Sequence, residues 1–175
     1  MASLLLLGAC SNEESKPAET KEPEKAVAEE QKEMAESGFI TQISTGDILV
    51  NNIYFKVGKD VKVVTDNGEE ISDAKIGDIR TGMKVSVDYV GPLEQKFPME
   101  AEAETITILN DEESATQSEA LQAYINEEQL SSLVIMGQPI VRDNEIGFLF
   151  SNAAEGTMSE VKINLDTHEY TVGGE

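Results

Sequence analysis

Apolar and polar residues alternate in short runs from residue 38 onward, with turn-forming residues between the runs. Residues 53–57 show the two-residue period of a half-buried strand, and residues 83–89 keep that period over their whole length. Asn51 and Asn52 lie between two apolar runs, and because asparagine tolerates positive φ, this pair predicts a tight hairpin turn. We therefore expect a series of short strands joined by tight turns.

The last run of this region, residues 99–109, changes phase in its middle. Ala101 and Ala103 share one side of an extended strand, whereas the two isoleucines that follow have the opposite parity. One extra residue near Glu104, a β-bulge, would turn all four apolar side chains inward and bend the strand. We therefore predict a mainly β fold whose first domain, residues 38–110, is a small five-stranded OB-like β-barrel.

A helical pattern followed by strands characterises the C-terminal part. After a polar linker at residues 110–117, in which residues 114–117 resemble a capping box, the apolar residues form one helical face that ends near Gln129. Further apolar runs, beginning with residues 133–136, indicate a three- or four-stranded antiparallel meander. The prediction for residues 114–175 is a small α+β domain. Units of ~60 residues bury only about 60% of their unfolded surface, so we expect the two domains to pack together.

Residues 11–37 have a different composition, with nine glutamates and four lysines among them. Two prolines interrupt the stretch, and its apolar residues are too sparse to offset the entropy cost of ordering. It predicts a disordered acidic linker with an end-to-end distance of roughly 30 Å. Such a linker would act as a spacer, and the alternative is an acidic segment that binds a partner.

The run Leu7-Gly8-Ala9-Cys10 resembles the bacterial lipobox and predicts a truncated lipoprotein signal over residues 1–10. Lipid on Cys10 would contribute about 0.8 kcal/mol of membrane affinity per buried CH₂. No basic residue precedes Cys10, and the apolar stretch is shorter than a signal core of roughly 7–15 residues. We expect the native start to lie upstream or the leader to have been trimmed, and anchoring to require a complete signal. The alternative is a buried apolar segment with a free cysteine.

Acidic residues outnumber basic ones by 34 to 13, which gives a net charge of −21. A chain this acidic lacks the basic patch that nucleic-acid binding requires, so we predict no nucleic-acid partner. The same charge repels anionic lipid and anionic wall polymer, and it attracts cations. Because Cys10 is the only cysteine, no internal disulfide can form.

Residue types needed for catalysis are scarce. The only histidine, His168, falls in a predicted turn, so a nucleophile, base and orienting group cannot be assembled around it. We predict no catalytic residues, no metal site and no cofactor. The stretch of residues 66–70 is acidic, but it lacks the spacing of an EF-hand loop and is interpreted as a turn. Low-affinity Ca²⁺ binding stays open as an alternative function.

A loop between the last two predicted barrel strands is the candidate binding site, because OB-like barrels often place ligand contacts there. Its prolines would reduce the entropy cost of binding by ordering the loop in advance. The candidate residues for a ligand or partner are Tyr89, Pro92, Lys96, Phe97 and Pro98. The alternative is a structural crossover in which Phe97 plugs the mouth of the barrel.

Several of these features together resemble one family. The lipobox, the charged stalk, residues 48–55, Gly82-Met83-Lys84-Val85 and the Tyr-x-Gly-Pro loop at residues 89–92 are similar to the YobA-like lipoproteins of Gram-positive spore-formers, a domain of unknown function. The resemblance covers residues 38–109. It implies an OB-like barrel exposed on the cell surface, without an established ligand, and only the lipidated Cys10 carries over as a functional residue.

The segment 114–175 lies outside that resemblance and is similar instead to the PepSY-type modules of secreted proteins and peptidase propeptides, which usually have glycine where His168 stands. Taken together, the sequence predicts a non-enzymatic lipoprotein, anchored in the cell membrane and facing outward, that binds an extracellular protein or a small ligand. A regulator or inhibitor of an exported peptidase, acting through the C-terminal domain, is the alternative.

Overall fold

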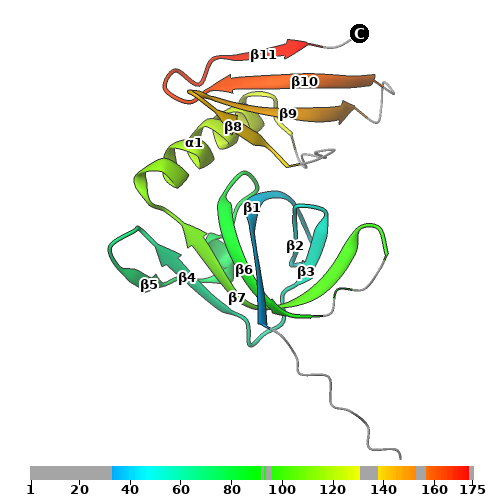
Figure 1. The fold of residues 1–175 in the computed structure, drawn as a ribbon, viewed down its shortest axis with the longest axis vertical. Coiled ribbons are helices and arrows are strands. Elements are labelled where there is room, and N and C mark those ends of the chain that lie inside the picture. Colours follow the sequence, from blue (N-terminus) through cyan, green and yellow to red (C-terminus); the bar gives the residue numbers. More distant parts are fainter. Residues whose placement is uncertain (1–32, 92, 94–95, 131–137, 153–156, 174–175) are drawn as a thin grey trace, which may run out of the picture. The chain divides into compact units, whose positions relative to one another are not determined.

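The computed structural model of the chain describes residues 33–91, 93, 96–130, 138–152 and 157–173 (Figure 1). Two modules follow each other: a seven-stranded sheet that includes a closed ring, and a helix with a four-stranded sheet. In chain order the elements are β1 (Glu33–Ser44), β2 (Asp47–Val50), β3 (Ile53–Lys56), β4 (Lys62–Asp66), β5 (Ile71–Asp73), the 3₁₀ helix η1 (Ile76–Asp78), β6 (Lys84–Val90), β7 (Met99–Leu109), α1 (Glu112–Glu127), β8 (Ile140–Arg142), β9 (Glu145–Asn152), β10 (Thr157–Asn164) and β11 (Tyr170–Gly173).

Five strands close into a barrel, in the order β1-β2-β3-β7-β6 and back to β1. All pairings in this ring are antiparallel except β3 with β7, which runs parallel from Ile53 opposite Met99 to Lys56 opposite Glu102. Strand β1 serves two neighbours, because its first half pairs with β6 and its second half with β2. The predicted mainly β fold with a five-stranded OB-like barrel is confirmed.

The predicted hairpin turn at Asn51 and Asn52 is also confirmed. Both residues have positive φ, 48° and 65°, and they connect β2 to β3. This conformation matches the twist of the flanking strands, which is why short hairpins favour residues that tolerate it.

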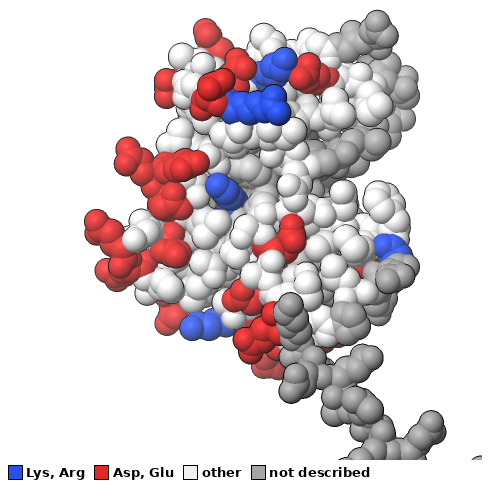
Figure 2. Space-filling view, in the orientation of Figure 1, with Lys and Arg blue, Asp and Glu red and all other residues white. Residues whose placement is uncertain are grey.

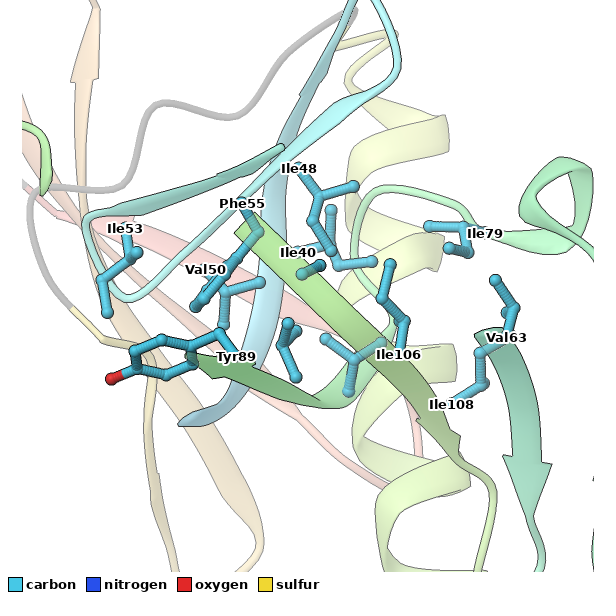
Figure 3. Close-up of a cluster of buried hydrophobic side chains, with 13 residues drawn as sticks. Ile40, Ile48, Val50, Ile53, Phe55, Val63, Ile79, Tyr89, Ile106 and Ile108 are labelled. Atoms are coloured by element: carbon cyan, nitrogen blue, oxygen red, sulfur yellow. The ribbon is translucent and has the colours of Figure 1, made fainter. Parts of the chain in front are cut away.

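Inside the ring, aliphatic side chains surround two aromatic ones (Figure 3). The rings of Phe55 and Tyr89 lie 5.3 Å apart, with their planes tilted by 57°. The interior is therefore occupied by side chains, and these come from every strand of the ring, from β4 and from the segment after η1. The other buried members of this cluster are Ile40, Ile48, Val50, Ile53, Val63, Ile79, Val85, Val87, Ala103, Ile106 and Ile108.

A β-bulge at Glu104 resolves the change of phase in β7. Strand β6 pairs Asp88 with Thr105 but Tyr89 with Ala103, which leaves Glu104 without an opposite residue. Apolar side chains on both sides of the bulge are buried, whereas Glu104 is exposed. On its other edge, β7 pairs with β3 before the bulge and with β4 after it. The predicted bulge is confirmed at the residue where the strand changes neighbours.

The prediction that the disordered linker extends to residue 37 is wrong. Strand β1 begins at Glu33, so residues 33–37 belong to this strand. These residues pair in antiparallel register with residues 86–90 of β6, and the Ser37 hydroxyl donates to the Ser86 hydroxyl oxygen at 3.0 Å. Most side chains of this stretch are exposed, so backbone pairing rather than apolar burial holds it in the sheet. A pattern of apolar residues cannot reveal a strand of this kind.

Strands β4 and β5 extend the sheet beyond the ring. In the turn between them, the Asp66 carboxylate accepts the N–H of Gly68 at 2.9 Å, and the Asn67 side chain accepts the N–H groups of Glu69 and Glu70 at 3.0 and 2.8 Å. The interpretation of this acidic stretch as a turn is confirmed. All residues of β5 are exposed, so no apolar alternation announces this strand.

In the C-terminal module, α1 packs on one face of the antiparallel sheet β11-β10-β9-β8 (Figure 1). Strands β9 and β10 pair over their whole length, from Glu145 opposite Asn164 to Asn152 opposite Thr157. The predicted helix and antiparallel meander are confirmed, with four strands. The buried residues between helix and sheet are Ala120, Leu121, Tyr124, Ile125, Ile146, Phe148, Val161, Ile163 and Leu165.

The predicted start of the helix, and with it the polar linker of residues 110–117, is wrong. Asp111 is the N-cap and accepts the backbone N–H of Ser114 at 3.1 Å, so Ser114 is the third helical residue and its side chain is buried. An acidic residue can cap a helix as well as serine does, and three acidic residues precede Ser114. The predicted end near Gln129 agrees with the structure. Residues 133–136, the expected start of the second sheet, lie outside the described residues.

The two modules pack together, as expected from their sizes, because α1 lies against the start of β6. The backbone N–H of Lys84 donates to the Ser118 hydroxyl at 3.0 Å, and the Lys84 ammonium donates to the Gln117 side chain at 2.9 Å. Phe39 of β1 is buried in the core of the C-terminal module. The boundary between modules is therefore bridged by a shared apolar side chain and by hydrogen bonds.

Candidate functional site

The structure separates the residues of the predicted binding loop. Tyr89 is a core residue of the barrel, 2% exposed, and only its phenol oxygen points away from the cluster (Figure 3). Burial, and then the nearby Glu36 carboxylate, raise the pKa of Tyr89. Pro92 lies outside the described residues, as does Cys10. Of the predicted loop site, Lys96, Phe97 and Pro98 thus remain as neighbours at the surface.

Phe97 is 89% exposed, so the alternative in which it plugs the barrel mouth is wrong. Leu93 and Met99 pack against the barrel core instead. The Lys96 ammonium lies 2.8 Å from a Glu100 carboxylate oxygen, and Lys56 lies 3.1 Å from the same oxygen. Hydrogen bonds from Lys96 and then Lys56 lower the pKa of Glu100. These contacts tie the end of the loop to the barrel wall.

A groove of about 780 Å³ lies on the four-stranded sheet. Alternation along the strands shows which face it occupies. Ile146 and Phe148 of β9 point toward α1, so Glu145, Gly147 and Leu149 belong to the opposite, outer face. The residues that line the groove are Gln138, Ile140, Arg142, Asp143, Glu145, Gly147, Phe148, Leu149, Glu160 and Lys162. The groove is therefore on the side of the sheet that the helix leaves uncovered.

Gly147 forms the floor of this groove. Its neighbours across the strands are Ile140 on β8 and Lys162 on β10, and along β9 they are Glu145 and Leu149. Because glycine has no side chain, these four residues surround a gap in the outer face. A glycine in a strand interior costs roughly 0.5–1 kcal/mol relative to alanine, so its position calls for a reason.

Within the described residues, no contact requires glycine at position 147. A Cβ built there would meet its nearest atoms, the Val161 carbonyl oxygen, the Ile140 carbonyl oxygen and the Lys162 Cγ, at 3.8 to 3.9 Å, which is ordinary van der Waals distance. Its φ also lies outside the left-handed region. By contrast, a Cβ at Gly38 would lie 2.4 Å from the Asn51 side chain. A glycine inside a strand, such as Gly147, often marks the close approach of a ligand or another backbone.

Charges of both signs border the groove. The Lys162 ammonium lies 3.3 Å from Glu160, whereas the exposed guanidinium of Arg142 forms no hydrogen bond or ion pair within the described part of the chain. Figure 2 shows basic and acidic groups side by side over this module, whereas acidic groups prevail over the rest of that view. An unpaired guanidinium can bind a carboxylate, a carbonyl oxygen or the face of an aromatic ring.

What the groove can do chemically follows from its lining. Apolar surface comes from Ile140 and Leu149, which are 57% and 48% exposed, and charge comes from the residues beside them. Among the described residues, the lining side chains include no hydroxyl, thiol or imidazole. The groove thus offers apolar contacts beside charges of both signs.

A second, smaller hollow of about 220 Å³ lies where α1 meets the barrel. Its polar groups bond to each other: Lys84 donates to Gln117, and the Gln117 amide donates to the Glu113 carboxylate at 2.9 Å. Asn51 donates to the Ser37 carbonyl oxygen at 2.8 Å. Because these groups already have partners, this hollow is the weaker candidate for a ligand site.

The remaining sequence candidates do not form a site. His168 has φ of 58° in the turn before β11, and its backbone N–H donates to the Asn164 carbonyl oxygen at 3.0 Å. Across the described ranges, no three His, Cys, Asp or Glu side chains are grouped so that they could hold a metal ion. Nor does any helix there have the length and apolar character needed to cross a membrane.

Gly147 is itself a signal for the groove in the sequence. Gly147 interrupts an alternating run in which Ile146, Phe148 and Phe150 share one face. An isolated glycine inside such a run suggests a bulge or the close approach of another backbone. The strand pairing of β9 is regular through this residue, which excludes the bulge.

Comparison of the chain with models of protein families, with curated proteins and with solved structures gives no match. The fold and the groove define a class in structural terms: a two-module β-rich protein with an open groove on its second sheet. The resemblance of residues 38–109 to YobA-like lipoproteins stays a prediction, as does the resemblance of residues 114–175 to PepSY-type modules.

Proposed function

We propose that this chain is a non-enzymatic interaction protein that binds another polypeptide in the groove above Gly147. The observation that carries the proposal is a strand glycine that its own chain does not require, surrounded by exposed apolar and charged side chains. An open groove on a sheet face suits an extended polypeptide, because such a ligand can lie along the strands.

The location we propose is the outer face of the cell membrane, with Cys10 as the lipid attachment site when the native signal is complete. The lipobox pattern of residues 7–10 supports the anchor, and the acidic stretch after it supports a spacer. A net charge of −21 would keep the domains off an anionic surface. Replacing Cys10 with alanine and following incorporation of a labelled fatty acid tests this part, because anchoring through Cys10 requires that the label disappear.

Regulation or inhibition of an exported peptidase is the second candidate function. It is favoured by one observation, namely that the groove belongs to the C-terminal module and not to the barrel loop. A peptidase that binds polypeptide segments could present a loop of its own to this groove. No feature of the described residues favours the Ca²⁺ alternative in the same way.

Photo-crosslinking in cells tests the interaction directly. A photoreactive amino acid at Leu149 places the reagent at the groove, and the same amino acid at Ile71 of β5 places it on an exposed residue of the barrel module. We expect Leu149 to give a discrete adduct with an exported protein, and Gly147→Val to abolish that adduct. Equal adducts from both positions, or none from Leu149, would rule out the groove as the interaction surface.

A further inference from the structure

We propose that the polypeptide bound in the groove is an extended segment of a neutral or basic protein and that an aromatic side chain of this segment sits over Gly147. This inference rests on the proposed function and adds the chemistry of the ligand. It is argued from the shape of the gap, from the residues at its edges and from the charge of the whole chain.

The shape of the gap favours a flat side chain. A ring over Gly147 would contact the exposed backbone of β9, with Ile140 and Leu149 beside it. On the opposite side it would meet the aliphatic part of Lys162, whose Cγ lies 3.9 Å from the position of a Cβ at residue 147. Aromatic rings cover strand glycines in this way within single proteins, where a neighbouring strand supplies the ring. Here the neighbours are isoleucine and lysine, so the ring must come from outside.

Charges at the rim of the gap select for an aromatic over an aliphatic group. Lys162 lies opposite Gly147 and flanks the gap. Arg142 lies opposite Glu145, the next residue of β9 on the same face. Both basic side chains are long and exposed, so their cations can cover the outer face of the ring, where the quadrupole attracts them, and an aliphatic side chain gains nothing from the same cation. An aromatic and an aliphatic ligand side chain would make the same apolar contacts. The two cations are therefore what favours the aromatic one.

The spacing of same-face positions suggests what accompanies the ring. In an extended segment, every second side chain points the same way, about 7 Å from the last. With the ring over Gly147, the side chains two residues before and after it would approach Glu145 at one end and Glu160 at the other. Arg142 lies opposite Glu145, so the ligand meets both signs of charge at that end, whereas Glu160 favours lysine or arginine at the other end.

Net charge decides between possible partners. A second copy of this chain could offer the exposed Phe97 as the aromatic residue. Each of the two copies would, however, carry a net charge of −21. Long-range repulsion opposes that encounter, whereas a neutral or basic partner is steered toward the acidic surface. The occupant is therefore a different polypeptide.

A short peptide containing tryptophan tests this assignment, because the chain itself has no tryptophan and all indole emission comes from the ligand. The probe is acetyl-Lys-Ser-Trp-Ser-Lys-amide, and the same peptide with alanine in place of tryptophan competes against it. We expect a saturable shift of the emission to shorter wavelength with the full chain, and at least tenfold weaker competition by the alanine peptide.

Two matched glycine variants locate the binding site. Gly147→Val fills the gap with a residue that suits strands, and Gly58→Val changes a glycine of the barrel module that has open space around it. We expect Gly147→Val to weaken peptide binding at least tenfold and Gly58→Val to change it less than twofold. Arg142→Gln, which leaves the gap open, should weaken binding severalfold.

Each other result has a defined meaning. Equal binding by Gly147→Val and the unchanged chain, no saturable binding, or equal competition by the alanine peptide would overturn the aromatic assignment. If the Leu149 adduct persists while the peptide fails, the interaction function stands and only the ligand chemistry is wrong. Absence of both the Leu149 adduct and peptide binding would overturn the proposed function as well. Concentration-dependent dimers in sedimentation equilibrium that Gly147→Val abolishes would place a second copy in the groove and overturn the choice of partner.

Discussion

Phe39 and Ile40 are consecutive residues of β1 whose side chains enter different hydrophobic cores. Ile40 is fully buried inside the barrel, and Phe39, 4% exposed, is buried with the residues between α1 and the four-stranded sheet. Successive side chains of a strand point to opposite faces, so one strand can supply both cores. This arrangement makes the folding of the two modules interdependent.

Truncation of Phe39 should therefore be costly. We expect Phe39→Ala to lower the free energy of unfolding by about 3–5 kcal/mol, because it removes a buried ring and leaves a cavity. Phe97→Ala is the matched control, since Phe97 is 89% exposed and its loss should change stability by no more than about 0.5 kcal/mol. Urea unfolding followed by circular dichroism measures both. Similar midpoints for the two variants would show that Phe39 does not join the modules.

Gly38 should be indispensable for the placement of Asn51. A Cβ at residue 38 would lie 2.4 Å from the Asn51 side-chain oxygen, and the Asn51 amide bonds to the Ser37 carbonyl oxygen at 2.8 Å. We expect Gly38→Ala to destabilise the chain by about 1–3 kcal/mol, which is typical of overpacking. Gly58→Ala, where nothing lies within 4 Å, should be neutral or slightly stabilising.

A second substitution tests whether the cost at residue 38 comes from this contact. Asn51→Gly keeps a residue that accepts the φ of 48° and removes the side chain that would clash. We expect Gly38→Ala to be less costly in the Asn51→Gly background than alone, with a coupling energy of about 1 kcal/mol measured from urea midpoints. Additive effects of the two substitutions would place the origin of the cost elsewhere.

Regularities that depend on apolar burial could be predicted from the sequence. The turn at Asn51, the bulge at Glu104 and the helix with its meander all follow from where apolar residues fall relative to each face. What could not be predicted depends on backbone pairing without burial, as at residues 33–37 and in β5. Among equivalent polar residues, the sequence also did not decide which one caps α1.

The candidate site also depends on strand pairing that the sequence pattern does not reveal. A loop with an aromatic residue and two prolines was predicted from composition, and the structure places Tyr89 in the barrel core and leaves Phe97 exposed. The groove arises from the registers of β8, β9 and β10, which put Ile140 and Lys162 on either side of Gly147. Register is a property of three segments together, so no single stretch of sequence could reveal the groove.

The N-cap of α1 should make the helix sensitive to acid. Hydrogen bonds from the Ser114 hydroxyl and then from its backbone N–H lower the pKa of Asp111. A lowered folded-state pKa stabilises the fold above the unfolded value of about 3.9, and this contribution is lost as the pH falls through the folded-state pKa. Asp111→Asn retains a capping side chain but cannot titrate. We expect the difference in urea midpoint between the chain and this variant to shrink at acidic pH, and an unchanged difference would contradict the capping role.

Tyr170 should make the edge of the C-terminal sheet sensitive to alkali. Its hydroxyl donates to the Glu128 carboxylate at the C-terminus of α1, and this hydrogen bond, followed by burial, raises the pKa of Tyr170 to about 12. Its ring also packs edge-on against Tyr124, with the ring centroids 4.8 Å apart. Since the unfolded value is about 10, the contribution to stability is fully present below pH ~10 and is lost as the pH rises through the folded-state value.

Glu128→Gln tests this contact, because it keeps an acceptor oxygen but removes the negative charge that opposes ionisation of the phenol. Ultraviolet absorbance of tyrosinate, compared with a Tyr170→Phe variant to assign the signal, should show the Tyr170 midpoint moving from about 12 toward its ordinary value in Glu128→Gln. The alkaline loss of stability, which begins near the unfolded value of about 10 in both proteins, should be smaller in that variant. If the midpoint stays where it is, the Glu128 carboxylate does not raise the pKa of Tyr170, and burial together with the charge of Glu127 must account for it.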